Sequence, residues 1–274
     1  MESFIKEIAE DLKKIREQKP LIHHITNFVV MNETANATLC IGALPVMAHA
    51  EEEVAEMVAI AGALLLNIGT LTPKLIDSMI VAGKRANELD IPVVLDPVGA
   101  GATKLRTDAC MRILDEVKVS IIRGNSAEIG VIAGAGGEIK GVEAVGKSDN
   151  MLEIALKFAK ESNSVISVTG AQDIITNGEQ IMLVNNGDPM LAIITGTGCM
   201  STTITAAFAA VQKDYFKAAA GALVAFGLAG EKAAAVSGQR PGTFHSALYD
   251  EIYELKPEDI LRGAKVELAD QIKI

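Results

Sequence analysis

The sequence has no tryptophan, only three tyrosines and only three cysteines. The cysteines (Cys40, Cys110 and Cys199) are odd in number and far apart, which excludes a disulfide framework and a Cys-x-x-Cys metal site and suits a reducing compartment. A concentrated block of Lys and Arg is also missing, since 35 acidic residues outweigh 25 basic ones and the net charge is -10. Nucleic-acid binding rests on a basic footprint and is therefore disfavoured.

Several common nucleotide and hydrolase motifs are absent as well. No Gly-x-x-x-x-Gly-Lys-[Ser/Thr] or Gly-x-Ser-x-Gly occurs, and the run at 134–139 lacks the last glycine of the dinucleotide fingerprint. Cys199 has no His partner that the sequence identifies, which weakens a thiol-hydrolase interpretation. A P-loop, a Rossmann site and a serine hydrolase are all disfavoured.

Long apolar runs are missing too. The longest uncharged helical stretch, 218–230, is shorter than the roughly 20 residues of a membrane span, and residues 1–8 alternate charged and apolar side chains without a signal-peptide core. We therefore expect a cytoplasmic protein that does not bind membranes. With 49% hydrophobic residues and no internal linker, the chain predicts one α/β domain over residues 1–274.

Short apolar runs alternate with helical patterns along most of the chain. The uninterrupted apolar character of these runs is typical of strands buried on both faces, so we predict a mainly parallel sheet with helices on both faces. Asn177-Gly178 is a strong hairpin signal and predicts an antiparallel edge from 173–176 and 180–184. The other predicted strands are 21–25, 44–48, 63–67, 92–96, 119–123 and 164–169.

The helical predictions follow from apolar spacing and from breakers. A stripe from Phe4 to Ile15 predicts a helix that Pro20 ends, and residues 134–150 are predicted to form one long irregular loop. A helix rich in glutamate is expected after residue 48. The other predicted helices are 31–40, 73–89, 107–117, 198–211, 214–237 and 243–254.

Polar residues at the predicted strand ends are the first candidates for a site, because ligands of parallel α/β sheets bind beyond the carboxyl ends of the strands. Asp96 precedes a glycine-rich turn, and Glu128 lies one turn into a helix that Asn125 begins. Each carboxylate fits an ordinary cap or turn, or both hold Mg²⁺ through waters. The strand-end residues are Asn27, Met47, Asn67, Asp96, Arg123 and Thr169.

The run Thr-Gly-Thr-Gly-Cys at 195–199 precedes a helix rich in small residues. It fits a turn that caps a buried helix, or an anion site at the helix N-terminus. Arg123 fits a phosphate ligand or a structural ion pair, and Thr169 fits a nucleotide contact or a turn. His23 and His24 are expected to be buried and satisfied by hydrogen bonds.

Six segments together resemble the ribokinase-like vitamin kinases, most nearly the hydroxyethylthiazole kinases of thiamine salvage, over essentially the whole chain. They are 23–27 (His-His-Ile-Thr-Asn), 44–48 (Leu-Pro-Val-Met-Ala), 95–101 (Leu-Asp-Pro-Val-Gly-Ala-Gly), 123–128 (Arg-Gly-Asn-Ser-Ala-Glu) and 195–199, with Val168-Thr169-Gly170 between the last two. The resemblance implies a ribokinase-like fold and ATP-dependent, Mg²⁺-assisted phosphorylation of the primary alcohol of 4-methyl-5-(2-hydroxyethyl)thiazole.

The resemblance also implies roles for individual residues and a homotrimer whose substrate pockets lie between subunits. Asp96 and Glu128 would support the metal and the phosphates, and Asn27 would shape the thiazole pocket. The remaining contacts are those of Met47 and Gly196 with the thiazole and of Arg123 and Thr169 with ATP.

Cys199 stands where most ribokinase-like enzymes have a catalytic aspartate, and the thiazole kinases share the cysteine. A helix N-terminus can lower the pKa of a thiol, but phosphoryl transfer depends mainly on positioning and charge stabilisation. We expect the backbone amides from Gly196 through Gly198 to Cys199 to stabilise the transferring group, and Cys199 to align the alcohol. The alternatives are a kinase for hydroxymethylpyrimidine or pyridoxal, and a nucleotide-binding relative without catalysis.

Overall fold

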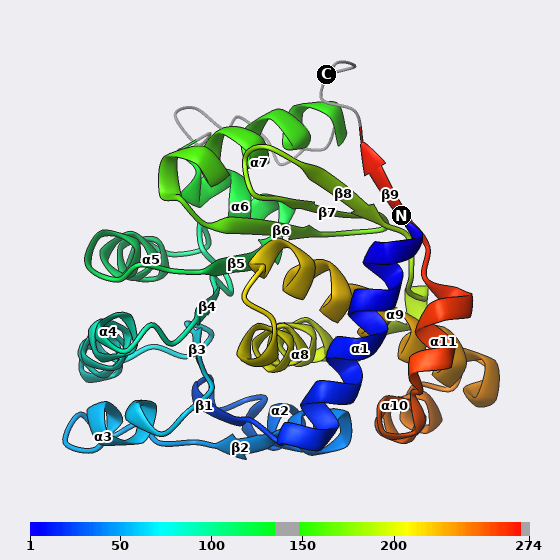
Figure 1. Ribbon diagram of the computed structural model, residues 1–274. Coiled ribbons are helices and arrows are strands. Elements are labelled where there is room, and N and C mark those ends of the chain that lie inside the picture. The colour runs from blue at the N-terminus through cyan, green and yellow to red at the C-terminus, as the bar shows by residue number, and fades with distance from the viewer. Residues whose placement is uncertain (135–147, 270–274) are drawn as a thin grey trace.

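The computed structural model describes residues 1–134 and 148–269 (Figure 1). Most of the loop predicted at 134–150 lies outside the described residues. Its last three residues are already helical, because α7 (Ser148–Ser162) begins at Ser148. The predicted C-terminal boundary of this loop is therefore wrong.

One nine-stranded sheet forms the centre of the molecule, in the order β2-β1-β3-β4-β5-β6-β7-β8-β9. Pairing is parallel from β2 to β6 and antiparallel from β6 to β9, which confirms a mainly parallel sheet with an antiparallel edge. The strands are β1 (Leu21–Ile25), β2 (Leu44–Val46), β3 (Ala63–Asn67), β4 (Val93–Asp96), β5 (Ile121–Asn125), β6 (Val165–Thr169), β7 (Asp173–Thr176), β8 (Ile181–Val184) and β9 (Val266–Ala269).

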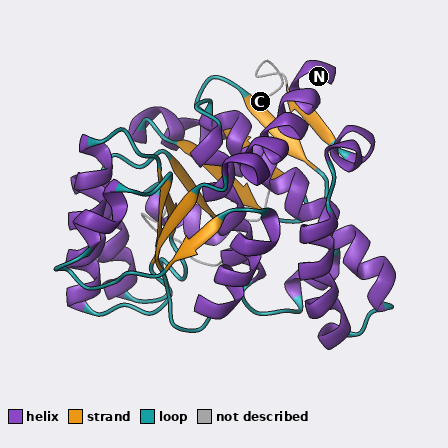
Figure 2. Ribbon diagram, turned by 60° about the horizontal axis from the view of Figure 1, so that its bottom comes forward, coloured by secondary structure: helices purple, strands orange, loops and turns teal. Residues whose placement is uncertain are grey.

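Helices cover both faces of the sheet, and each face has its own apolar core (Figures 1 and 2). All five residues of β3 are buried, as the uninterrupted apolar run predicts. One face carries α3 (Val54–Ala59), α4 (Pro73–Glu88), α5 (Lys104–Glu116), α6 (Ser126–Ile132) and α7. The other carries α1 (Glu2–Gln18), α2 (Met31–Ile41), α8 (Thr197–Val211), α9 (Tyr215–Ser237), α10 (Pro241–Glu254) and α11 (Pro257–Gly263).

Three boundaries differ from the prediction in ways that affect the site. α5 begins at Lys104, earlier than predicted, because the Thr103 side chain caps it by accepting a hydrogen bond from the Arg106 amide. β5 runs two residues further than predicted, so Arg123 lies inside the strand and not at its end. β2 ends at Val46, and Met47 follows it.

Two elements near the C-terminus were not predicted. α11 packs beside α1, and the chain then enters the sheet as β9, outside β8 (Figure 1). The hairpin of β7 and β8 is antiparallel as predicted, but the outermost strand on this side is β9.

α9 is long and apolar enough to cross a membrane by length and composition alone. Most of its apolar window is buried inside the molecule, where it packs against α8 and α10. Its composition is therefore explained by its place in the core.

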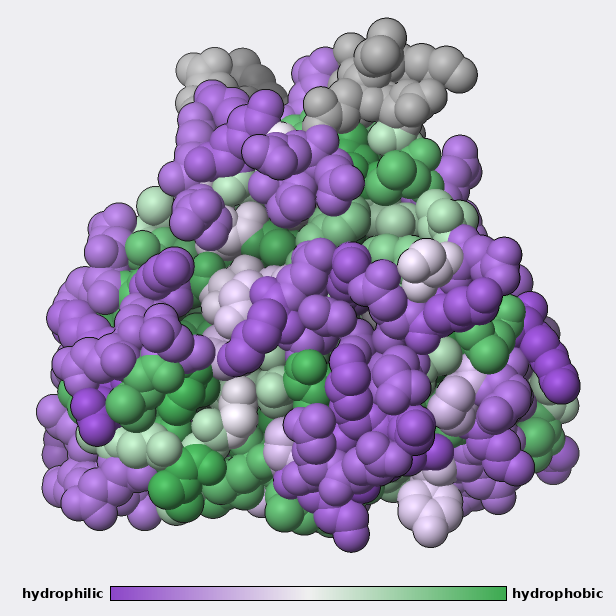
Figure 3. All heavy atoms as spheres, viewed as in Figure 1, coloured by the Kyte–Doolittle hydropathy of each residue, from purple (hydrophilic) through white to green (hydrophobic). Residues whose placement is uncertain are grey.

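Hydrophilic side chains cover most of the face that Figure 3 shows, with apolar side chains in small separate groups.

His23 and His24 are both fully buried on β1, as predicted. His23 Nε2 lies 2.8 Å from the Ala48 carbonyl oxygen, and His24 Nε2 lies 3.2 Å from Thr38 Oγ1. Within the described residues both Nδ1 atoms have no partner, so each ring is only half satisfied. Burial lowers the pKa of His24 to about 3, and the ring is neutral at physiological pH.

Candidate active site

A cavity of ≈ 410 Å³ lies at the carboxyl ends of the central parallel strands. Residues from seven separate segments meet there, and they include all but one of the residues to which the sequence analysis gave a role. The exception is Met47, which stands one residue beyond edge strand β2 and does not line the cavity. The predicted residues that do line it are Asn27, Asp96, Arg123, Glu128, Thr169, Gly196, Gly198 and Cys199.

A buried polar network forms the floor of this cavity. Asn67, the last residue of β3, donates hydrogen bonds from Nδ2 to Asp96 Oδ2 at 3.0 Å and to Cys199 Sγ at 3.2 Å. Its Oδ1 accepts a hydrogen bond from Asn27 Nδ2 at 2.8 Å, and Asn27 Nδ2 also lies 3.6 Å from Cys199 Sγ. Thr202 donates to Asp96 Oδ2 at 2.8 Å. Four elements are thereby joined around one thiol and one carboxylate.

Burial keeps the Cys199 thiol in its neutral form. Burial and the neighbouring Asp96 carboxylate raise the pKa of Cys199 to about 12, despite the lowering effects of Asn67, Arg123 and Asn27. A helix N-terminus can lower the pKa of a thiol, but here the desolvation of the thiolate dominates. Cys199 is therefore a protonated group that can orient a hydroxyl, and not a thiolate base.

Asp96 is also perturbed by its surroundings. Burial raises its pKa to about 6, while Arg123 and the hydrogen bonds from Thr202 and Cys199 oppose that rise and Glu128 adds to it. A buried carboxylate next to another negative group is stabilised by an added positive charge. The position is thus suited to a cation.

Glu128 is held by backbone amides at both of its oxygens. Oε2 accepts from the Asn125 amide at 2.9 Å, and the Asn125 side chain accepts from the Glu128 amide at 2.9 Å, which completes the capping box of α6. Oε1 accepts from the Gly99 amide at 2.8 Å. The capping interpretation is confirmed, and the same carboxylate also faces the cavity.

The N-terminus of α8 presents free amides at the cavity wall. Gly196, the N-cap, has φ +87°, and the first intrahelical bond runs from the Met200 amide to its carbonyl at 2.8 Å. The amides of Thr197, Gly198 and Cys199 therefore precede the helical ladder and can face an anion. A Cβ at Gly198 would lie 3.0 Å from Arg123 Nη1, so the glycine permits the close approach of this guanidinium.

Arg123 stands between this cavity and a second one of ≈ 550 Å³. No ion pair of Arg123 occurs within the described part of the chain, and its buried Nε has no hydrogen-bond partner there. That observation disfavours a structural ion pair. Thr169 lines both cavities and donates a hydrogen bond to the Gly124 carbonyl at 3.3 Å, which leaves its oxygen free to accept.

The second cavity combines apolar walls with polar ends. Leu191, Leu223 and Phe226 line it, and the buried Asp173 lies at its side. Burial raises the pKa of Asp173 to about 6, against the lowering effects of the Gly170 amide and Arg123. Arg123, Thr169 and Gly198 line both cavities, so the two cavities lie side by side.

The donor set fits Mg²⁺ of the kind that also binds substrate phosphates. Within residues 1–134 and 148–269 no cluster of three His, Cys, Asp or Glu side chains could hold a metal alone. Mg²⁺ commonly binds through one or two carboxylates plus waters and phosphate oxygens. Asp96 and Glu128 supply two carboxylates on one cavity wall, which matches that arrangement.

Comparison with known proteins decides the family. Residues 12–258 match the model described as "Hydroxyethylthiazole kinase family". The chain belongs to the hydroxyethylthiazole kinase family. A protein named hydroxyethylthiazole kinase from Thermoanaerobacter pseudethanolicus is 57% identical over 259 residues, which cover 94% of this chain and 98% of that one.

Solved structures of relatives agree with this family and define the fold. A hydroxyethylthiazole kinase protein from Pyrococcus horikoshii OT3 is 46% identical, with a TM-score of 0.89, and the match covers 97% of this chain and 100% of that one. A ribokinase-like superfamily protein from Enterococcus faecalis is 13% identical, with a TM-score of 0.62, over 94% of this chain and 95% of that one. This member of the family therefore has the ribokinase-like fold that the sequence predicted.

Asn67 and Thr202 are site residues to which sequence reasoning gave no role. Asn67 was recognised as a strand end, but an uncharged amide signals no chemistry until its partners are known. Thr202 lies three residues after Cys199, on the same face of α8, and this helical spacing was the available signal. Both side chains donate hydrogen bonds to Asp96. Asn67 also donates one to Cys199, so it links the thiol to the carboxylate.

Proposed function

We propose that this chain transfers the terminal phosphoryl group of ATP to the primary alcohol of 4-methyl-5-(2-hydroxyethyl)thiazole, a step of thiamine salvage. The observation that supports this most strongly is the pair of cavities that share Arg123, Thr169 and Gly198. One cavity accommodates a nucleotide and the other a small alcohol. The shared residues lie where the phosphate chain would pass from one cavity to the other.

The nucleotide is assigned to the larger cavity. Its apolar side chains Leu223 and Phe226 suit a base, and Arg123 at its inner end suits the phosphates. Thr169 can donate or accept a hydrogen bond at the same junction. The terminal phosphate then lies before the free amides of Gly198 and Cys199, where a helix N-terminus favours negative charge.

The alcohol is assigned to the smaller cavity, with its hydroxyl against Cys199. Asn27 and Gly196 line the same space, as expected for a thiazole pocket. Because the Cys199 thiol is neutral, it aligns the hydroxyl and only assists deprotonation. The amides from Gly196 to Cys199 stabilise the charge on the transferring group and contribute most to the rate.

Asp96 and Glu128 would hold Mg²⁺ together with the phosphates of ATP. The metal supplies neutralisation of phosphate charge during transfer. Neighbouring groups orient both carboxylates. Asn67 and Thr202 donate to Asp96 Oδ2, and the Gly99 and Asn125 amides donate to Glu128. Both carboxylates are thereby fixed before any ligand arrives.

We also propose a homotrimer whose pockets are completed by neighbouring subunits. Phe28 and Val29, next to Asn27, are each 64% exposed although both are apolar, and Val29 lines the alcohol cavity. Met47 is half-buried and lies away from its own cavity. Both features fit an arrangement in which Met47 of one subunit covers the thiazole bound to another.

The function is tested by assaying the purified chain with ATP, Mg²⁺ and each of three alcohols: hydroxyethylthiazole, hydroxymethylpyrimidine and pyridoxal. We expect phosphorylation of the thiazole at a kcat/KM far above the other two, and its loss in Asp96→Asn. Preference for another alcohol would assign the chain to a different vitamin precursor. ATP binding without turnover on any of the three would indicate a nucleotide-binding protein without catalysis.

The trimer has its own test. Light scattering on the eluting protein should give three times the mass of the 28.8 kDa chain, and Phe28→Asp should shift it toward the monomer. Met47→Ala should raise KM for the thiazole while KM for ATP stays unchanged. A monomeric and fully active wild type would overturn this assignment without affecting the proposed reaction.

A further inference from the structure

Arg106 joins two loops that carry different halves of the site. It lies in the first turn of α5, half-buried at the wall of the smaller cavity. Its Nη1 donates to the Val98 carbonyl at 2.6 Å, and its Nη2 donates to the Gly69 carbonyl at 2.6 Å. Gly69 follows β3 and Val98 follows β4, so one planar guanidinium spans the two strand ends.

The loop at Gly69 supports the alcohol side of the site. The Gly69 amide donates to Asn67 Oδ1 at 2.9 Å, the same oxygen that Asn27 binds. A Cβ at Gly69 would lie 2.7 Å from Asn27 Nδ2, so the loop backbone packs directly on that side chain. The position of Gly69 therefore determines where the side-chain amides of Asn27 and Asn67 lie against Cys199.

The loop at Val98 supports the phosphate side. The next residue, Gly99, donates its amide to Glu128 Oε1 at 2.8 Å. Gly99 has φ +73°, and a Cβ there would lie 2.6 Å from Arg106 Nη1. The loop thus has a backbone conformation that favours glycine, and the missing side chain leaves the space that the guanidinium occupies.

We propose that Arg106 is a positioning residue that fixes the distance between the alcohol and phosphate halves of the site, an inference that rests on the proposed kinase function. It acts through the Gly69 and Val98 carbonyls and not by touching the reacting atoms. A fork of two N–H donors at fixed separation suits this purpose better than a flexible ammonium. A small change in the alignment of the alcohol with the phosphoryl group is costly in rate.

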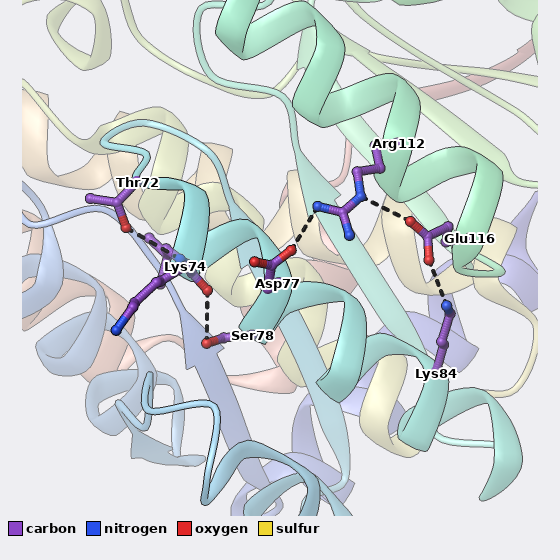
Figure 4. Close-up of polar contacts among 8 residues, drawn as sticks. Thr72, Lys74, Asp77, Ser78, Lys84, Arg112 and Glu116 are labelled. Carbon is purple, nitrogen blue, oxygen red and sulfur yellow. Dashed lines mark hydrogen bonds and ion pairs between the residues drawn. The ribbon is translucent and has the colours of Figure 1, made fainter.

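The test compares Arg106→Gln with Arg112→Gln. Arg112 lies on the same helix and loses the same charge, but it binds Asp77 and Glu116 at the surface between α4 and α5 (Figure 4). Turnover is followed as ADP and as phosphorylated thiazole in the same samples. The ratio of the two products reports how often the phosphoryl group goes to water, which a general loss of stability does not change.

We expect Arg106→Gln to lower kcat about 100-fold, with KM for ATP little changed and more ADP than phosphorylated thiazole. Arg106→Lys should recover part of kcat, because an ammonium can reach only one carbonyl at a time with good geometry. Arg112→Gln should keep the wild-type rate and a product ratio of one. Gly99→Ala, which retains Arg106 but fills its space, should raise the ratio as Arg106→Gln does.

The proposal is overturned if Arg106→Gln keeps the wild-type kcat and product ratio. It is also overturned if its activity merely follows its loss of folded protein, with the ratio still at one. Where Arg106→Gln does not fold, Arg106→Lys and Gly99→Ala decide by the same ratio. Failure of wild type to phosphorylate the thiazole would instead reject the proposed function.

Discussion

Two polar networks in this molecule join neighbouring elements, one in the interior and one at the surface. One is the buried network of Asn27, Asn67, Asp96, Cys199 and Thr202 at the carboxyl ends of the strands. The other lies at the surface, where Arg112 binds Asp77 and Glu116, and Glu116 also binds Lys84 at 2.5 Å (Figure 4). Both connect several segments, but only the first is hidden from water.

Burial decides what each network does to its carboxylate. Desolvation raises the pKa of Asp96 to about 6, whereas hydrogen bonds from Lys84 and Arg112 lower the pKa of Glu116 at the surface. In the buried network each lost partner leaves a polar group without water to replace it. At the surface water replaces the partner. The buried network therefore holds its side chains in one arrangement, and the loss of any partner destabilises the site.

The largest effect should come from Asn67→Ala. The change leaves the Asn27 and Gly69 donors without their acceptor and frees Cys199 and Asp96, so we expect kcat to fall at least about 100-fold. The free energy of unfolding should fall by roughly 1–3 kcal/mol for each buried group left unpaired. Steady-state kinetics and urea unfolding measure the two effects.

Asn87 provides the matched control for Asn67. It also makes two side-chain bonds, to the Lys118 carbonyl at 2.8 Å and from the Lys118 amide at 2.7 Å, but these bonds are open to solvent. Asn87→Ala should keep the wild-type kcat and lose little stability. Equal losses in the two variants would contradict the distinction between the networks.

Asp96→Asn should lose activity but gain stability at neutral pH. The folded pKa of about 6 exceeds the ordinary aspartate value of 3.8, so ionisation destabilises the fold as pH rises from about 4 to 6. Above that range the cost reaches about 3 kcal/mol. Without metal or nucleotide, the variant should unfold at higher urea than wild type at pH 7.5, and the two should converge at pH 4. A wild type that is more stable at pH 7.5 would contradict the raised pKa.

The Cys199 thiol should react slowly with iodoacetamide. With a pKa of about 12, the thiolate is about 1,000-fold or more scarcer at pH 8 than for a free thiol. Peptide mapping after timed alkylation, in a Cys40→Ala background, should show slow modification that accelerates above pH 10. Rapid alkylation at pH 7 would show that the helix N-terminus outweighs burial.

The smallest effects should come from the surface network. Arg112→Gln should lower Tm at the limit of detection, and added salt should reduce even that difference. For Glu116 the sign opposes that of Asp96. The lowered pKa of Glu116 means that its ionised form stabilises the fold above the ordinary glutamate pKa of 4.5 and ceases to do so as pH falls. Glu116→Gln should therefore differ from wild type at pH 7 and match it in acid. A large loss of Tm in Arg112→Gln would make the two networks equivalent.

The sequence predicts most of the sheet because the buried parallel strands are short and wholly apolar. β9 gives no such signal: it has Glu267 in its middle, and it pairs only at the edge with a strand far away in the chain. The apolar run stops at Arg123 and so predicts the strand end there. Backbone pairing with β6 nevertheless continues to Asn125. Pairing between distant segments is not visible in local composition.

The site was predictable where charge or glycine indicates chemistry, as at Asp96, Glu128 and the run at 195–199. Asn67 is among the strand-end candidates, but its role and that of Arg106 were not predictable, because both depend on partners that only the fold brings near. The raised pKa of Cys199 could not be predicted from the sequence for a related reason. A helix N-terminus is visible in sequence, whereas the depth of burial that opposes it is not.

Single-turnover kinetics of Cys199→Ala test most directly whether the thiol is auxiliary and the amides and carboxylates carry the phosphoryl transfer. With thiazole, ATP and Mg²⁺ premixed at saturation, the variant should retain transfer at a rate reduced about 10- to 100-fold. It should remain well above Glu128→Gln measured without Mg²⁺. A loss in Cys199→Ala as complete as in that doubly impaired sample would show that the thiol is essential, and would contradict the account.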